Sequence, residues 1–149
     1  MILELKEKDQ IQTNEERESW LSDPLVQQYV ELRDVGSVRN DEDNGLLTNF
    51  NRYYEIYNND HHVGDIKVFY ETEDDIFYKR AQILMVVGDR NKGIGTEALN
   101  ILMDKMKDIY QSAYCVIQKS NIASLKILKR NNFHVDKMDG QTIQLSREF

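Results

Sequence analysis

One stretch of this chain, residues 83–99, limits the possible folds more than any other. It begins with an apolar run, Ile83 to Val87, that is typical of a buried strand. A loop containing Gly93 and Gly95 follows, and then a long amphipathic segment that predicts a helix. The unpaired N–H groups and the dipole at a helix N-terminus favour an anion. The order of strand, glycine loop and helix therefore predicts a site for a phosphorylated ligand.

The side chains of the loop fit that prediction. Gly93 and Gly95 carry no Cβ that would keep a phosphate away from the backbone. Arg90 and Lys92 add positive charge at the same place.

Spacing excludes two familiar kinds of glycine loop. A P-loop needs Lys and Ser/Thr directly after its second glycine. Counted from Gly88, that glycine is Gly93, and Ile94 and Gly95 occupy the two positions. The dinucleotide fingerprint fits Gly93, Gly95 and Ala98, but it expects an acid about 20 residues further on. Gln118 and Lys119 stand there instead, and too little chain follows for the second half of such a fold.

The loop matches a third pattern, Arg/Gln-x-x-Gly-x-Gly/Ala, through Arg90, Gly93 and Gly95. Further on, the segment 121–133 matches a second pattern, Asn-x-x-(Ala/Ser)-x-x-x-Tyr-x-x-x-Gly-Phe. Its matching residues are Asn121, Ser124 and Phe133, while Leu128 and Asn132 depart from it at the Tyr and Gly positions.

On these two motifs the chain resembles the GCN5-related N-acetyltransferase (GNAT) superfamily. The resemblance covers residues 50–149 well and the N-terminal third loosely. Residues 20–30 are loosely similar to acetyltransferases that modify the N-termini of ribosomal proteins. The resemblance implies an α/β fold with a mixed, mostly antiparallel sheet flanked by helices, in which the fourth and fifth strands splay apart around acetyl-CoA.

Carried over onto this sequence, the resemblance assigns a set of cofactor-binding residues. Backbone groups of Met85 and Val87 would hold the pantetheine arm and polarise the thioester. Asn121 would meet the same arm, with Ser124 nearby, although Asn121 fits a helix cap equally well. The pyrophosphate would be wrapped by Arg90, Asn91, Lys92, Gly93, Ile94, Gly95 and Thr96.

The catalytic residues are harder to assign. An acceptor ammonium has a pKa near 10.4 and must lose a proton before it attacks. Many relatives carry a Glu where this chain has Gln82, so Glu55 is the alternative candidate for the base. The other interpretation of Glu55 is a solvated strand residue with no catalytic role. Leu128 occupies the position at which many relatives have a catalytic Tyr, so Tyr114 is the candidate acid. The other interpretation of Tyr114 is a packed strand residue. Such an acid matters less here because a thiol of pKa about 8.5 is a tolerable leaving group.

Other reactive residues fit plainer roles. The single cysteine, Cys115, rules out an internal disulfide and is typical of a small buried hydrophobe. His61 and His62 are adjacent in a predicted turn, which is a poor spacing for joint metal binding, and are expected to be exposed. No metal is implied.

Composition limits the class of protein. A chain of 149 residues with 40% hydrophobic and 30% charged residues fits one soluble domain spanning 1–149. It has no apolar run long enough to span a membrane and no signal-peptide core, so a cytoplasmic location is expected. The net charge of −7, concentrated in residues 1–100, argues against nucleic acid as a partner. A homodimer is compatible with these features.

Apolar periodicity and turn residues predict the elements. Helices are expected near residue 14 and after Pro24, and the loop 36–49 either covers the acceptor site or is slack. Residues 71–75 predict an acidic turn. Apolar residues of the helix after the glycine loop are Leu99, Leu102, Met103, Met106 and Ile109, and those of the helix 121–130 are Ile122, Leu125 and Leu128. The expected strands are 2–5, 50–57, 63–70, a strand within 76–87, 113–117, 133–135 and 142–145.

The sequence thus predicts transfer of an acetyl group from acetyl-CoA directly to a primary amine, either on a small molecule or on a protein. Because Leu128 and Gln82 replace the usual acid and base, a non-catalytic acyl-CoA-binding or interaction module is the alternative.

Overall fold

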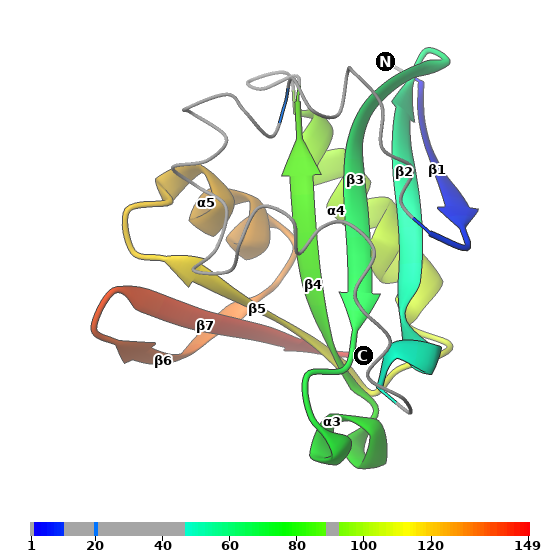
Figure 1. The fold of residues 1–149 in the computed structure, drawn as a ribbon. Coiled ribbons are helices and arrows are strands. Elements are labelled where there is room, and N and C mark those ends of the chain that lie inside the picture. The colour runs from blue at the N-terminus through cyan, green and yellow to red at the C-terminus, as the bar shows by residue number, and fades with distance from the viewer. Residues whose placement is uncertain (1, 11–19, 21–46, 89–92) are drawn as a thin grey trace.

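The computed structural model describes residues 2–10, 20, 47–88 and 93–149, and these form one seven-stranded sheet with helices packed against it (Figure 1). The strand order is β1-β2-β3-β4-β5-β7-β6. The strands are β1 (Leu3–Lys8), β2 (Arg52–Asn58), β3 (His61–Phe69), β4 (Arg80–Val87), β5 (Ser112–Gln118), β6 (His134–Asp139) and β7 (Thr142–Glu148). The helices are the 3-10 turn η2 (Thr48–Phe50), α3 (Glu73–Tyr78), α4 (Ile94–Met106) and α5 (Ile122–Arg130).

Five of the six strand pairings are antiparallel, and the exception lies at the centre of the sheet. β4 and β5 are parallel, with α4 in the connection between them. Their pairing comprises only Arg80 with Ser112, Ala81 with Ala113 and Gln82 with Tyr114. Beyond those residues the two strands run apart, as Figure 1 shows. The mixed, mostly antiparallel sheet with splayed fourth and fifth strands is the fold expected from the sequence.

The core lies between the sheet and α4, which is behind the strands in Figure 1. Leu99, Leu102, Met103 and Met106 of α4 are all buried, as the helical spacing predicted. Ile109 does not belong to this face, because α4 ends at Met106 and Ile109 is exposed. Ile122, expected on the buried face of α5, is exposed as well.

The acidic stretch 71–75 is not the turn that the sequence predicted, because α3 begins within it. A capping box starts the helix: the backbone N–H of Asp75 donates to Thr72 Oγ1 at 3.2 Å, and the N–H of Thr72 donates to Asp75 Oδ2 at 3.3 Å. A helix of six residues is too short to show apolar periodicity. The Thr-x-x-Asp spacing was the signal that could have revealed it.

The prediction for His62 is also wrong. The β2–β3 turn is Asn59 and Asp60, with φ of 51° and 67°, so the hairpin needs only two left-handed residues. β3 therefore begins at His61, and the His62 side chain is only 10% exposed.

α5 ends at Arg130, the last residue expected of this helix. Asn132 has φ of 66°, the left-handed conformation in which Asn is the common substitute for glycine. The expected helices near residue 14 and after Pro24, and most of the loop 36–49, lie outside the described residues.

Candidate functional site

The divergence of β4 from β5 opens a cleft in the sheet. Its volume is about 530 Å³, including the part open to solvent. Side chains from both strands, α4 and α5 line it, and most are apolar. The lining residues are Ile83, Leu84, Met85, Leu99, Cys115, Ile117, Asn121, Ser124, Ile127 and Leu128.

The strand register shows which backbone groups face this cleft. The N–H of Gly88 donates to the carbonyl of Val63 at 2.7 Å, and the β3–β4 pairing continues from there without a break. In an antiparallel pair, alternate residues direct both backbone groups at the partner strand. Leu84 and Val86 therefore bond to β3, while the N–H and C=O groups of Met85 and Val87 point to the side where β5 has moved away.

One end of the cleft meets the N-terminus of α4. Gly93 is the N-cap residue, with φ of 73°, and a Cβ built on it would meet no atom within 4 Å. The first N–H groups of the helix, from Ile94 to Thr96, have no partner within the helix. Of the seven loop residues assigned from the sequence, Arg90, Asn91 and Lys92 lie outside the described residues.

Glycine at position 95 is explained by helix packing rather than by the approach of a phosphate. A Cβ at this position would come within 2.9 Å of Ile127 Cδ1, so α4 and α5 approach each other here. The side chain of Asn131 adds a hydrogen bond between the two helices: its Nδ2 donates to the carbonyl of Thr96 at 3.3 Å. Gly95 is thus explained by helix packing, without a ligand.

Asn121 and Ser124 stand together in the cleft wall. Asn121 is 1% exposed, and its Oδ1 accepts a hydrogen bond from the backbone N–H of Ser124 at 3.0 Å. The helix-cap role considered from the sequence is therefore present. A contact between Asn121 and a ligand remains a prediction.

Glu55 is a buried carboxylate, whereas the sequence allowed a solvated one. Its Oε1 accepts a hydrogen bond from the Tyr57 hydroxyl at 2.9 Å and lies 3.8 Å from Lys8 Nζ. On β2 it alternates with Tyr54 and Ile56, which belong to the core, so its side chain is on the face opposite α4. Lys8 and Glu55 also line a second, open pocket.

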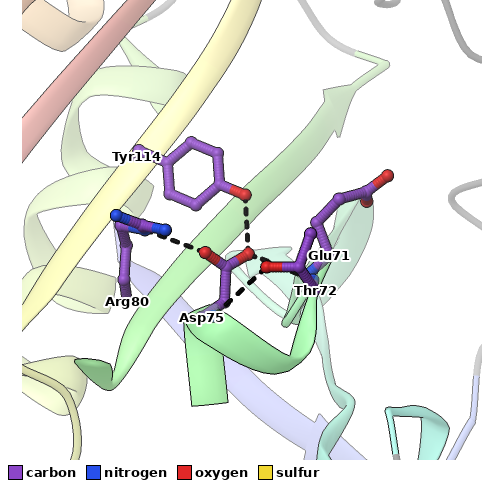
Figure 2. Close-up of polar contacts among 5 residues, drawn as sticks. All are labelled: Glu71, Thr72, Asp75, Arg80 and Tyr114. Atoms are coloured by element: carbon purple, nitrogen blue, oxygen red, sulfur yellow. Dashed lines mark hydrogen bonds and ion pairs between the residues drawn. The ribbon is translucent and has the colours of Figure 1, made fainter. Parts of the chain in front are cut away.

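Tyr114 belongs to a polar network at the point where β4 and β5 part (Figure 2). Its hydroxyl donates to Asp75 Oδ2 at 2.9 Å, and Arg80 Nε donates to Asp75 Oδ1 at 2.8 Å. The backbone N–H groups of Glu71 and Thr72 also donate to Oδ2, at 3.0 and 3.3 Å. The buried Asp75 carboxylate thereby joins α3, β4 and β5 beside their last paired residues. This network was not predicted from the sequence.

Three further residues occupy the positions expected of packing side chains. Cys115 forms no disulfide and is buried in the core, as predicted. Leu128 and Gln82 are buried too. None of the helices in the described part of the chain is long and apolar enough to cross a membrane.

Comparison with known proteins identifies the fold. No protein-family model and no curated protein sequence matches this chain. Many solved structures do. A domain from Methanocaldococcus jannaschii is 18% identical with a TM-score of 0.72, covering 99% of this chain and 100% of that one. N-acetyltransferase PseH from Campylobacter jejuni is 16% identical with a TM-score of 0.64, covering 98% of this chain and 97% of that one.

Two further structures carry names that bear on function. PseH in complex with acetyl coenzyme A has a TM-score of 0.56 at 18% identity, over 66% of this chain and 67% of that one. An acetyltransferase from Salmonella typhimurium that modifies the N-terminal serine of a 50S ribosomal protein has a TM-score of 0.55 at 18% identity. The match covers 66% of this chain and 64% of that one. At such identities the likeness shows the fold, which is the GNAT fold that the two sequence motifs predicted.

Proposed function

We propose that this chain, which has the GNAT fold, is an N-acetyltransferase of one domain that transfers an acetyl group from acetyl-CoA directly to a primary amine. The observation that carries the proposal is the pair of backbone positions, Met85 and Val87, that bond to neither neighbouring strand of the described sheet and face an apolar cleft beside the first turn of α4. Buried backbone groups need partners, and the amides of an extended pantetheine arm can supply them. The acetyl-CoA complex of a protein with this fold supports that assignment.

The proposed cofactor contacts divide between the two ends of the cleft. The backbone of Met85 and Val87 holds the pantetheine arm, with Asn121 and Ser124 on the opposite wall. Unpaired N–H groups at the start of α4 bind the pyrophosphate, where the open space beside Gly93 admits it. The full proposed set at that end is Arg90, Asn91, Lys92, Gly93, Ile94, Gly95 and Thr96.

Acetyl-CoA supplies an activated thioester, and the protein must receive the proton of the attacking amine. Glu55 is the proposed base. Its side chain lies on the sheet face opposite α4, two strands from β4, so it acts through water. Tyr114 is the proposed acid, although the bond from its hydroxyl to Asp75 supports the packing role that the sequence also allowed.

The acceptor class stays open between a small amine and a protein N-terminus, and the Salmonella typhimurium structure supports the second. The alternative of a non-catalytic acyl-CoA-binding module rests on Gln82 and Leu128, since neither side chain can act as an acid or a base.

Calorimetric titration with acetyl-CoA tests the cofactor site, with Gly93→Ala and Gly140→Ala as a matched pair. Both glycines have positive φ, 73° and 47°, and neither Cβ would meet another atom within 4 Å. Each substitution should therefore cost about 1 kcal/mol of stability through backbone strain. Only Gly93 is at the N-terminus of α4, where the pyrophosphate is proposed to bind, so we expect Gly93→Ala to weaken acetyl-CoA binding and Gly140→Ala to leave it unchanged.

Wild-type protein that binds no acetyl-CoA would refute the proposal. An equal loss of acetyl-CoA affinity in both variants would show that the glycine loop is not part of the binding site. Binding without thiol release across a panel of amines and N-terminal peptides would favour the non-catalytic module.

A further inference from the structure

β6 forms one edge of the sheet and is exposed along its whole length (Figure 1). It pairs with β7 on one side, and its other side has no partner strand in the described part of the chain. Two of its exposed residues are apolar: Val135 is 37% exposed and Met138 is 59% exposed. An edge strand presents a row of backbone N–H and C=O groups to any second strand that can pair with it.

A bulge gives β6 one apolar face and one polar face. Val135 pairs with Leu145 of β7 and Met138 pairs with Ile143, because Asp136 is an extra residue in β6. Residues three apart in a regular strand point to opposite faces. Here both apolar side chains lie on the face of Ile143 and Leu145, which belong to the core. They therefore extend the apolar face of the sheet to its edge.

The polar face of β6 carries the four remaining side chains, which are His134, Asp136, Lys137 and Asp139. Asp136 Oδ1 accepts a hydrogen bond from Ser146 Oγ at 2.9 Å, and Ser146 points away from the core because it follows a buried leucine on β7. His134 Nε2 is 3.2 Å from Asp136 Oδ1, and Lys137 Nζ is 3.8 Å from Asp139 Oδ2. Basic and acidic groups thus alternate along this face.

The order of residues along β6 is self-complementary. Two copies of the strand can pair antiparallel about a two-fold axis that passes between Asp136 and Lys137. The cross-strand pairs are then Asp136 with Lys137, His134 with Asp139 and Val135 with Met138. Apolar pairs and pairs of opposite charge both stabilise neighbouring antiparallel strands. An interface between identical surfaces requires this kind of self-complementarity.

The bulge also selects this register over its neighbours. A shift of one or two residues in either direction places Val135 or Met138 opposite a side chain of the polar face, because the two apolar residues are three apart. Bulges and charges commonly prevent an edge strand from associating. In β6 they instead leave one register in which both faces match.

We propose that β6 is an interface between two copies of this chain, through which their sheets join into one continuous antiparallel sheet. The two copies use the same strand, so the association closes at a dimer. Six residues per copy form a contact smaller than a standard interface, and the dimer is therefore weak and depends on protein concentration. None of the residues that line the cofactor cleft belongs to β6, so the proposal does not depend on the proposed activity.

Sedimentation velocity from micromolar to millimolar protein tests the interface, at an ionic strength that screens the repulsion between chains of net charge −7. Asp136→Lys and Lys137→Glu each place like charges opposite one another twice in the dimer, since the axis repeats every pair. We expect each variant alone to dimerise at least about tenfold more weakly than the wild type. Mixing the two variants restores both pairs of opposite charge, so we expect the mixture to associate more strongly than either variant alone.

Lys105→Glu is the matched control. The exposed Lys105 follows Asp104 on α4 as Lys137 follows Asp136 on β6, and the substitution makes the same change in net charge. We expect this variant to dimerise like the wild type. A wild-type protein that stays monomeric at millimolar concentration would overturn the proposal. Equal losses in Lys105→Glu and Lys137→Glu, or a mixture that associates no better than its components, would overturn it as well.

A second measurement needs only the wild-type protein, in case a charge-reversal variant fails to fold. Backbone amide signals can be followed by NMR between dilute and concentrated samples. We expect the signals of residues 134–139 to shift with concentration, because these residues change from solvent contact to strand pairing. Concentration-dependent shifts confined to other parts of the chain would show a different interface and would overturn the proposal.

Discussion

Three glycines around the β4–α4 loop lack a side chain for three different reasons. Gly93 adopts a left-handed conformation beside open space, as a ligand-binding loop requires. Gly95 makes room for Ile127 of α5. A Cβ at Gly88 would come within 2.3 Å of the Trp20 ring, so that glycine is needed by an aromatic neighbour. The sequence predicted approach of a phosphate at both Gly93 and Gly95, and this stays a prediction.

Tyr114→Phe separates the two roles considered for this residue. Removing the hydroxyl takes one donor from the buried Asp75 carboxylate and leaves Arg80 and the backbone donors in place. A hydrogen bond to a charged group contributes about 1.5–3 kcal/mol, so we expect the free energy of unfolding in urea to fall by that amount.

In the same variant, the rate of acetyl transfer shows whether Tyr114 is an acid. A packing role leaves kcat near the wild-type value in the folded protein. A large fall in kcat with unchanged stability would instead make Tyr114 the proton donor.

Elements with strong local signals could be predicted from the sequence, and elements defined by long-range pairing could not. The apolar period of α4 and the end of α5 at Arg130 are local features, and both lie where they were expected. α3 was missed because six residues carry no readable period. The bulges at Val63 in β3 and at Asp136 in β6 were missed because they exist only in the register between neighbouring strands.

The features of the candidate site also fall into those that local motifs predict and those that depend on contacts between distant residues. The sequence motifs pointed to Asn121 and Ser124, which line the cleft. They could not show that Asp75 binds Tyr114, 39 residues further along the chain.

For the molecule as a whole, the stability should depend on pH through three phenols. Burial raises the pKa values of Tyr54, Tyr70 and Tyr110 above the usual value near 10, most strongly at Tyr110, where Arg52 opposes the shift. The folded state therefore holds these protons more tightly than the unfolded state. Stability from this source is complete below about pH 10 and is lost as the pH rises further.

Urea unfolding across the alkaline range measures this dependence. We expect the free energy of unfolding to decrease above about pH 10, with a smaller slope in Tyr110→Phe. A flat profile through that range would contradict the burial of these phenols.

The central claim is that β4 presents the backbone of Met85 and Val87 to acetyl-CoA, and backbone amide exchange followed by NMR tests it most directly. The amides of Leu84 and Val86 bond to β3 and serve as internal controls on the same strand. We predict that acetyl-CoA slows exchange at Met85 and Val87 by about threefold to tenfold, which corresponds to a net hydrogen bond of about 0.7–1.4 kcal/mol, and leaves Leu84 and Val86 unchanged. Unaltered exchange at Met85 and Val87 in the presence of saturating acetyl-CoA would contradict the claim.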